Sequence, residues 1–136
     1  MKTILLDTHA AMWSVDALLP RQAQAAVDLA AANNELLISP ITAWEIGMLV
    51  SKKRLQLEVS TDEYVRRLFG APSLLVANLT AEIAVASTLL PGTFHADPAD
   101  RFLIATAAAY GAELMTRDKK IHDYAKKTRH IRCIAC

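Results

Sequence analysis

The sequence predicts an α/β fold, with helices covering both faces of a short-stranded, mainly parallel sheet. Apolar runs of three to five residues, a length typical of buried strands, alternate with longer segments of helical periodicity. The composition, 53% hydrophobic and 21% charged, is that of a compact globular protein. We find no internal repeat or Gly/Ser linker, and therefore expect one three-layer α/β/α domain over residues 1–136.

The predicted strands are apolar runs that stop at polar or turn residues. KTILL stops at Asp7, and the run from Leu36 to Ile38 stops at Ser39. We expect strands over residues 2–6, 36–38, 73–77, 113–115 and 131–133. Because helical segments separate them, right-handed crossovers and parallel pairing follow.

The predicted helices begin at capping residues and prolines. Pro20 opens an alanine-rich segment, and Ser39-Pro40 combines an N-cap with proline at the first helical position. Pro91-Gly92 stops the segment that begins at Thr80. We expect helices over residues 8–16, 20–32, 40–49, 61–69, 80–90, 98–110 and 118–127.

The N-terminal segment MKTILLDTHA has one lysine, and Asp7 interrupts its apolar run, so we expect no signal peptide. The most apolar windows, 71–81 and 102–112, are too short to span a membrane. We expect a cytoplasmic protein that does not contact membranes. The CIAC ending, Cys133 to Cys136, lacks the second Cys/His pair of a zinc site, so we interpret it as terminal packing.

Basic residues are unevenly distributed although the net charge is only +1. Seven of the fifteen lie between Arg117 and Arg132, and Lys52-Lys53-Arg54 forms a second group. Such clusters attract polyanions, but a solvated helix face also explains a charge run taken alone.

Asp7 and Asp118 each follow a predicted strand and precede a predicted helix. Capping of the helix and a functional role are equally good explanations for either residue. In parallel sheets, however, ligands gather beyond the carboxyl ends of the strands, where both acids are expected.

Glu45 lies within the apolar stripe of helix 40–49, which consists of Ile41, Trp44, Met48 and Leu49. Its carboxylate should therefore face the core, where a lone charge is costly without a partner such as an arginine or a metal ion. Asp100 repeats the pattern, because Leu103, Ile104 and Ala107 share its face of helix 98–110.

Asp97 precedes Asp100 by three residues and can share the same edge of the helix. The dipole at the helix N-terminus would also favour these two acids, but it does not explain Glu45.

Together these acids predict a carboxylate cluster at one edge of the sheet. Its members are Asp7, Glu45, Asp100 and Asp118. Oxygen ligands without a Cys or His pair suit Mg²⁺ or Mn²⁺. One or two such ions would activate a water and stabilise the leaving oxygen when a phosphodiester is cleaved. The basic groups would then hold a nucleic-acid backbone.

Three segments of the chain, LLDTHAAMW (5–13), SPITAWEIGML (39–49) and HADPADRFLIATAAAYGAELMTRD (95–118), resemble the PIN-domain ribonucleases in order and spacing. The resemblance is to the VapC-type toxins of bacterial toxin–antitoxin pairs. It implies a PIN fold, Mg²⁺- or Mn²⁺-dependent endoribonuclease activity on RNA, a homodimer, and inhibition in a higher assembly with a VapB-like antitoxin.

The resemblance also assigns roles. The acidic quartet, as catalytic residues and metal ligands, falls on Asp7, Glu45, Asp100 and Asp118. Of these, Asp118 would orient a water or a second ion. The auxiliary residues are the two hydroxyls Thr8 and Thr116, and Asp97, the first acid of the DPxDR pattern. Arg101 would pair with a carboxylate or with the antitoxin.

We expect RNA contacts from basic residues near these motifs, namely Lys52, Lys53, Arg54, Arg117, Lys119 and Lys120. His9 and His95 stand near the acids and could donate protons, although a surface or packing role is the better interpretation of a lone histidine.

Two other classes of protein deserve comparison. A phosphoacceptor receiver domain needs two acids after its first strand, and LLDTH supplies one. A catalytically silent module that binds RNA or protein is the alternative to a nuclease, and the intact quartet argues against it. Apolar surface on helices 20–32 and 40–49 would offer a partner helix a groove, unless these faces pack on each other or across a dimer.

Overall fold

The computed structural model describes residues 2–95 and 97–136. Its centre is a five-stranded sheet with the order β3-β2-β1-β4-β5, and the four pairings are all parallel. The strands are β1 (Ile4–Leu6), β2 (Leu36–Ile38), β3 (Leu75–Val76), β4 (Glu113–Met115) and β5 (Arg132–Ile134). The prediction of a short-stranded parallel sheet is confirmed.

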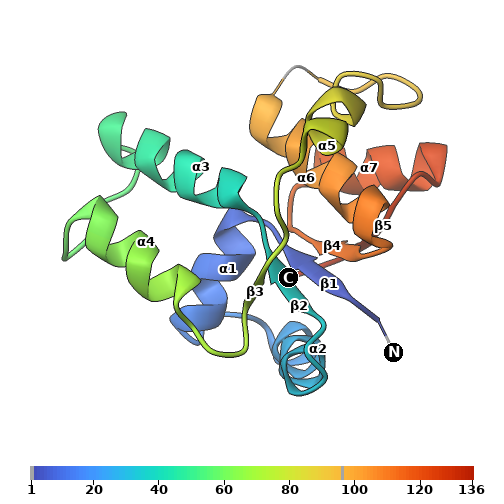
Figure 1. Ribbon diagram of the computed structural model, residues 1–136. Helices are drawn as coiled ribbons and strands as arrows, with labels where there is room; N and C mark the ends of the chain where they lie inside the picture. The colour runs from blue at the N-terminus through green and yellow to red at the C-terminus, as the bar shows by residue number, and fades with distance from the viewer. Residues whose placement is uncertain (1, 96) are drawn as a thin grey trace.

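Helices cover both faces of this sheet (Figure 1). In the described part of the chain they are α1 (Thr8–Val15), α2 (Arg21–Ala32), α3 (Pro40–Ser51), α4 (Thr61–Phe69), α5 (Ala81–Ala86), α6 (Pro98–Tyr110) and α7 (Lys119–Thr128). None of them is long and apolar enough to cross a membrane.

The hydrophobic core is divided by the sheet because successive side chains of a strand point to opposite faces. Ile4 and Leu6 of β1 pack with residues of α1 and α2, whereas Leu5 packs with α6 and α7. All three side chains are buried. The predicted three-layer arrangement is therefore confirmed.

The strand order reverses at β1, which lies between β2 and β4. Leu6 is in register with Ile38 of β2 and with Met115 of β4, so the three strands end at the same level. The residues that follow them, including Asp7 and Thr116, meet at one edge. This switch point is where open parallel sheets place their ligands.

Three predicted elements are clearly shorter than expected. The strand predicted over 2–6 begins only at Ile4. The strand predicted over 73–77 is reduced to Leu75–Val76, an edge strand whose side chains are exposed. The helix predicted over 80–90 stops at Ala86, because the amides of Thr88 and Leu89 bond carbonyls only three residues back.

Helix α3 corrects one expectation about its apolar stripe. Trp44, which we placed on the inward side, is 48% exposed, while Ile46 is fully buried. Ile41 packs in the core beneath α6, and Ile46 packs in the core beneath α1. Because successive residues turn by about 100° around a helix, Glu45 falls between the buried residues Ile41 and Thr42 and still faces inward.

Candidate active site

Asp7 stands at the switch point directly after β1. Its side chain is 9% exposed, and its amide donates to the carbonyl of Met115 at 3.1 Å. One carboxylate oxygen, Oδ1, caps α1 by accepting from the amide of Ala10 at 2.8 Å. Burial raises the pKa of Asp7, and hydrogen bonds from the Thr116 hydroxyl and the Ala10 amide offset only part of that rise.

Thr116 connects Asp7 to Asp118. The hydroxyl of Thr116, which is fully buried just beyond β4, donates to the Asp7 carboxylate and accepts from the amide of Asp118 at 3.0 Å. Asp118 in turn caps α7, because its Oδ1 accepts from the amide of Lys120 at 2.8 Å. Capping and a place in the site are thus compatible, since each carboxylate has a second oxygen.

Glu45 reaches the same region from α3. Its Oε1 accepts a hydrogen bond from the hydroxyl of Thr8, which is 2% exposed and belongs to the first turn of α1. Burial raises the pKa of Glu45, the Thr8 bond lowers it, and the charges of Asp97 and Asp7 raise it further. Glu45 therefore lies close enough to Asp97, the cap of α6, and Asp7, the cap of α1, for their charges to act on its carboxylate.

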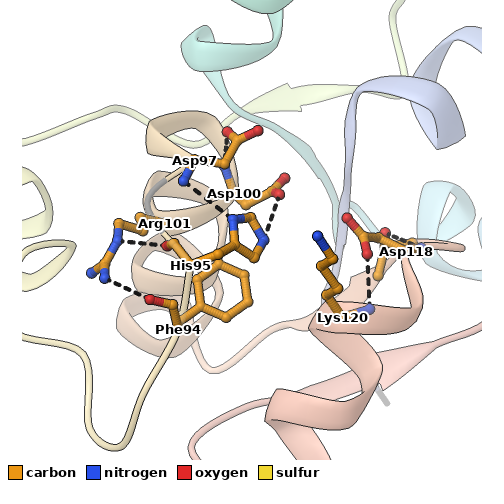
Figure 2. Close-up of polar contacts among 8 residues, drawn as sticks. Phe94, His95, Asp97, Asp100, Arg101, Asp118 and Lys120 are labelled. Carbon is orange, nitrogen blue, oxygen red and sulfur yellow. Dashed lines mark hydrogen bonds and ion pairs between the residues drawn. The ribbon is translucent and has the colours of Figure 1, made fainter.

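The fourth acid, Asp100, lies in the first turn of α6, and Asp97 is the N-cap of that helix. Oδ1 of Asp97 accepts from the amide of Asp100 at 3.3 Å. Figure 2 shows the side chain of His95 lying against these two acids on the side that faces Asp118. Possible ligand atoms of His95, Asp100 and Asp118 all lie within 4.8 Å of one another.

His95 is held in one orientation by its neighbours. Its Nδ1 accepts from the amide of Asp97 at 3.2 Å, so in the neutral ring the proton is on Nε2. Nε2 lies 3.3 Å from Oδ2 of Asp100 and has no hydrogen-bond partner among the described residues, so it also counts among the possible ligand atoms of the cluster (Figure 2). We had interpreted His95 as a surface or packing residue, and its place in the cluster is the main feature that the sequence analysis missed.

The electrostatic consequence of the cluster is clearest at Asp100. Burial raises the pKa of this carboxyl to about 7, and the charges of Asp97, Asp118, Glu45 and Asp7 add to the rise. The four acids of the predicted quartet, which follow β1 and β4 or lie on α3 and α6, are therefore close enough for their charges to interact. Of the four, Asp100 and Asp118 belong, with His95, to the group of possible ligand atoms within 4.8 Å.

Comparison with known proteins identifies the family of the chain. The model of the PIN domain family matches residues 4–127. The chain belongs to the PIN-domain family. Ribonuclease VapC22 of Mycobacterium tuberculosis is 32% identical over 124 residues, which cover 91% of this chain and 93% of the relative.

Solved structures share the fold of this PIN domain at lower identity. VapBC2 from Rickettsia felis, bound to a DNA fragment from its promoter, matches with a TM-score of 0.71 and 18% identity over 98% of both chains. DNA-bound VapBC from Salmonella typhimurium gives a TM-score of 0.67 and 18% identity, covering 99% of this chain and 98% of the other. FitAcB from Neisseria gonorrhoeae gives 0.64 and 18%, covering 96% of each chain.

Among the described residues of this PIN domain, Arg101 forms no ion pair with a carboxylate, contrary to one expectation. Its guanidinium donates to the backbone carbonyls of His95 and Phe94, each at 3.0 Å (Figure 2). It also donates to the carbonyl of Ser87 at 3.0 Å. Arg101 thereby ties the loop before α6 to the end of α5. Its effect on the site is to hold the segment that carries His95.

The basic residues of the PIN domain divide into two groups. Arg117, Lys119 and Lys120 are exposed and flank Asp118 at the site. Lys52, Lys53 and Arg54 are also exposed but follow the far end of α3, two helical turns beyond Glu45. That either group binds RNA stays a prediction.

The two cysteines lie on opposite sides of the sheet. Cys133 packs in the core with α6 and α7, whereas Cys136 packs in the core with α1 and α2. Burial raises the pKa of each thiol to about 11. Both are free, partly buried packing residues in this PIN domain.

Proposed function

We propose that this PIN domain is a Mg²⁺- or Mn²⁺-dependent endoribonuclease that acts as the toxin of a toxin–antitoxin pair. The observation that carries the proposal is an acidic cluster that no lysine or arginine side chain neutralises. In residues 2–95 and 97–136, no lysine or arginine forms an ion pair with Asp7, Glu45, Asp100 or Asp118. The ribonuclease activity named for VapC22 supports the same reaction.

The donor set fits a hard divalent cation, because these side chains offer carboxylate oxygens and the cluster concentrates negative charge. Asp7, Glu45 and Asp100 would hold the ion directly or through water, with Asp97 as an auxiliary acid and Asp118 orienting a water or a second ion. When bound, such an ion supplies a lower pKa for water and stabilises negative charge at the phosphate.

The neighbouring side chains hold the acids in position. Thr8 orients Glu45, and Thr116 orients Asp7 while it fixes the backbone of Asp118. Asp7, Glu45 and Asp118 are thus each anchored by a buried hydroxyl or by the helix that they cap, and Oδ2 of Asp100 lies 3.3 Å from Nε2 of His95. Such supporting contacts set the geometry of a metal site as much as the ligands themselves.

The partner that we propose is a VapB-like antitoxin, which would block the site in an assembly built on a toxin homodimer. Solved structures with this fold were determined as VapBC complexes. A cavity of about 540 Å³ lies between the end of α1 and α4, and Val15, Leu57 and Tyr64 are among its lining residues. Apolar side chains of a partner helix would fit into it.

Cleavage of total bacterial RNA by the purified, partner-free chain tests the nuclease. We expect discrete fragments with Mg²⁺ or Mn²⁺, none with EDTA, and none from Asp7→Asn, Glu45→Gln or Asp100→Asn. Asp123→Asn is the matched control, because Asp123 is an exposed acid of α7 outside the cluster. Activity retained by all three site variants would refute the assignment.

A catalytically silent module is the competing proposal. It predicts that the folded wild-type chain binds RNA or a partner but yields no metal-dependent fragments. The acids without a lysine or arginine partner argue against a silent module, because repulsion among these carboxylates is costly unless a metal ion is bound.

A further inference from the structure

Three planar side chains contact one another beside the acidic cluster. The ring centroids of His9 and Trp13, one turn apart on α1, are 5.6 Å apart with a tilt of 50°. The guanidinium carbon of Arg117 lies 4.8 Å from the centroid of the Trp13 ring. His9 and Arg117 are exposed, and Trp13 is half-buried against the core beneath α1. We call these residues the stacking group.

The stacking group borders the acids on two sides. His9 lies two residues after Asp7, and Arg117 directly precedes Asp118. His9 is close enough to Asp7 and Glu45 for its charge to favour ionisation of both carboxylates. A nucleotide whose phosphate reaches the carboxylates therefore has its base within reach of these planar groups.

The chemistry of the stacking group matches an unpaired base. Aromatic rings and guanidinium planes are the surfaces on which proteins stack bases of single-stranded RNA. Arg117 combines such a plane with a positive charge that suits the adjoining phosphate. The contact with Trp13 already restricts the long side chain of Arg117. Arg117 therefore loses less conformational entropy when RNA binds.

We propose that His9, Trp13 and Arg117 form a stacking platform for an unpaired RNA base next to the scissile phosphate. This inference rests on the proposed nuclease function and adds how the substrate is held.

Fluorescence of Trp13 provides a direct test. The chain has two tryptophans, so Trp44→Phe leaves Trp13 as the only indole. In this background, with EDTA to prevent cleavage, we would titrate a mixed-sequence single-stranded RNA of about a dozen nucleotides. A second strand of equal length with abasic sites carries the same phosphates without bases. We expect quenching by the first strand and much weaker quenching by the abasic strand.

Substitutions separate stacking from charge. Arg117→Ala and His9→Ala alter exposed side chains, and each should raise the Kd for RNA by about tenfold. Arg117→Lys keeps the charge but not the plane, and should weaken binding nearly as much as Arg117→Ala. Arg21→Ala, which removes an exposed charge from the start of α2, outside both basic groups, should change the Kd by less than about twofold.

Equal quenching by the abasic strand, or wild-type affinity in Arg117→Lys, would overturn the platform in favour of simple phosphate contacts. In that case metal-dependent cleavage by the wild-type chain would leave the nuclease assignment intact. If the wild-type chain neither cleaves total RNA nor binds the single strand, the platform and the proposed function both fall.

Discussion

Nε2 of His95 lies 3.3 Å from Oδ2 of Asp100, and the opposite ring nitrogen is held by the amide of Asp97. The imidazole is therefore fixed between the cap of α6 and an acid in the first turn of the same helix. His95 restrains the Asp100 carboxylate from outside the acidic quartet. This relationship gives the histidine a positioning role.

His95→Ala should lower kcat for RNA cleavage by roughly tenfold or more, because Asp100 loses the group that restrains it. KM for RNA should change little, since His95 does not belong to the proposed RNA-binding surface. Cleavage kinetics of a defined RNA measure both constants. His130→Ala removes an exposed histidine from the turn before β5 and should leave them unchanged. Equal kcat in the two variants would contradict the positioning role.

Asp100 should make the metal-free chain less stable as the pH rises. Its folded pKa, about 7, lies above the ordinary value of 3.8, so the folded state holds the proton more tightly than the unfolded state does. The contribution of the Asp100 carboxyl to the free energy of unfolding is fully present below about pH 4 and is lost as the pH rises to about 7. Urea unfolding in EDTA at several pH values should show this decline.

Asp100→Asn should flatten the decline and raise the unfolding free energy near pH 8 by about 1–3 kcal/mol. Asp123→Asn, at an exposed position, should reproduce the wild-type profile. A wild-type profile in Asp100→Asn would show that the carboxyl ionises normally in the folded chain.

Mg²⁺ or Mn²⁺ should raise the Tm of the wild-type chain, because a ligand that binds only the folded state stabilises it. At a metal concentration about 100 times the Kd, the gain is about 2.7 kcal/mol. Thermal unfolding with and without metal checks this effect. Glu45→Gln and Asp100→Asn should lose most of the shift, and an equal shift in these variants would place the bound ion elsewhere.

Thr116→Val should destabilise the chain by about 1–3 kcal/mol, since the Asp7 carboxylate and the Asp118 amide both lose a buried partner. Thr116→Ser keeps the hydroxyl and is the matched control. Urea unfolding of both variants gives the difference. If the valine and serine variants were equally stable, the hydroxyl would not be what links the two acids.

Arg101→Met should cost about 2–3 kcal/mol in unfolding free energy, because the carbonyls of Ser87, Phe94 and His95 lose a charged donor. Cleavage should fall as well, since the loop that carries His95 loses its anchor. Arg66→Met removes an exposed arginine that pairs with Glu63 and should cost less than about 1 kcal/mol.

The elements were predictable because local signals and burial agree in this chain. Ser39 and Pro40 open α3 as expected, and Leu36 to Ile38 forms β2 with the predicted limits. The errors occur where contacts between distant segments determine how long a strand is or which side chain of a helix is buried. Leu75 and Val76 have β-forming side chains but lie at an exposed edge, and Ile46 displaces Trp44 from the core because α3 bridges two packing regions.

The site was predictable only as far as its acids stand out against apolar surroundings. Asp7 after a strand and Glu45 on an inward helix face were visible in that way. His95 was not, because its position depends on a backbone hydrogen bond from Asp97. The contact between Trp13 and Arg117 joins residues 104 positions apart, and no periodicity within either segment indicates it.

Asp7, Asp97 and Asp118 each begin a helix as well as facing the cluster, whereas Glu45 and Asp100 cap none. A descendant that had abandoned catalysis would still be under pressure to keep the three helix caps, and could discard the other two acids without harm to its folding. Survival of Asp7, Asp97 and Asp118 in a homologous sequence is therefore poor evidence of an active enzyme. The informative positions for telling working copies from degenerate ones are those of Glu45 and Asp100.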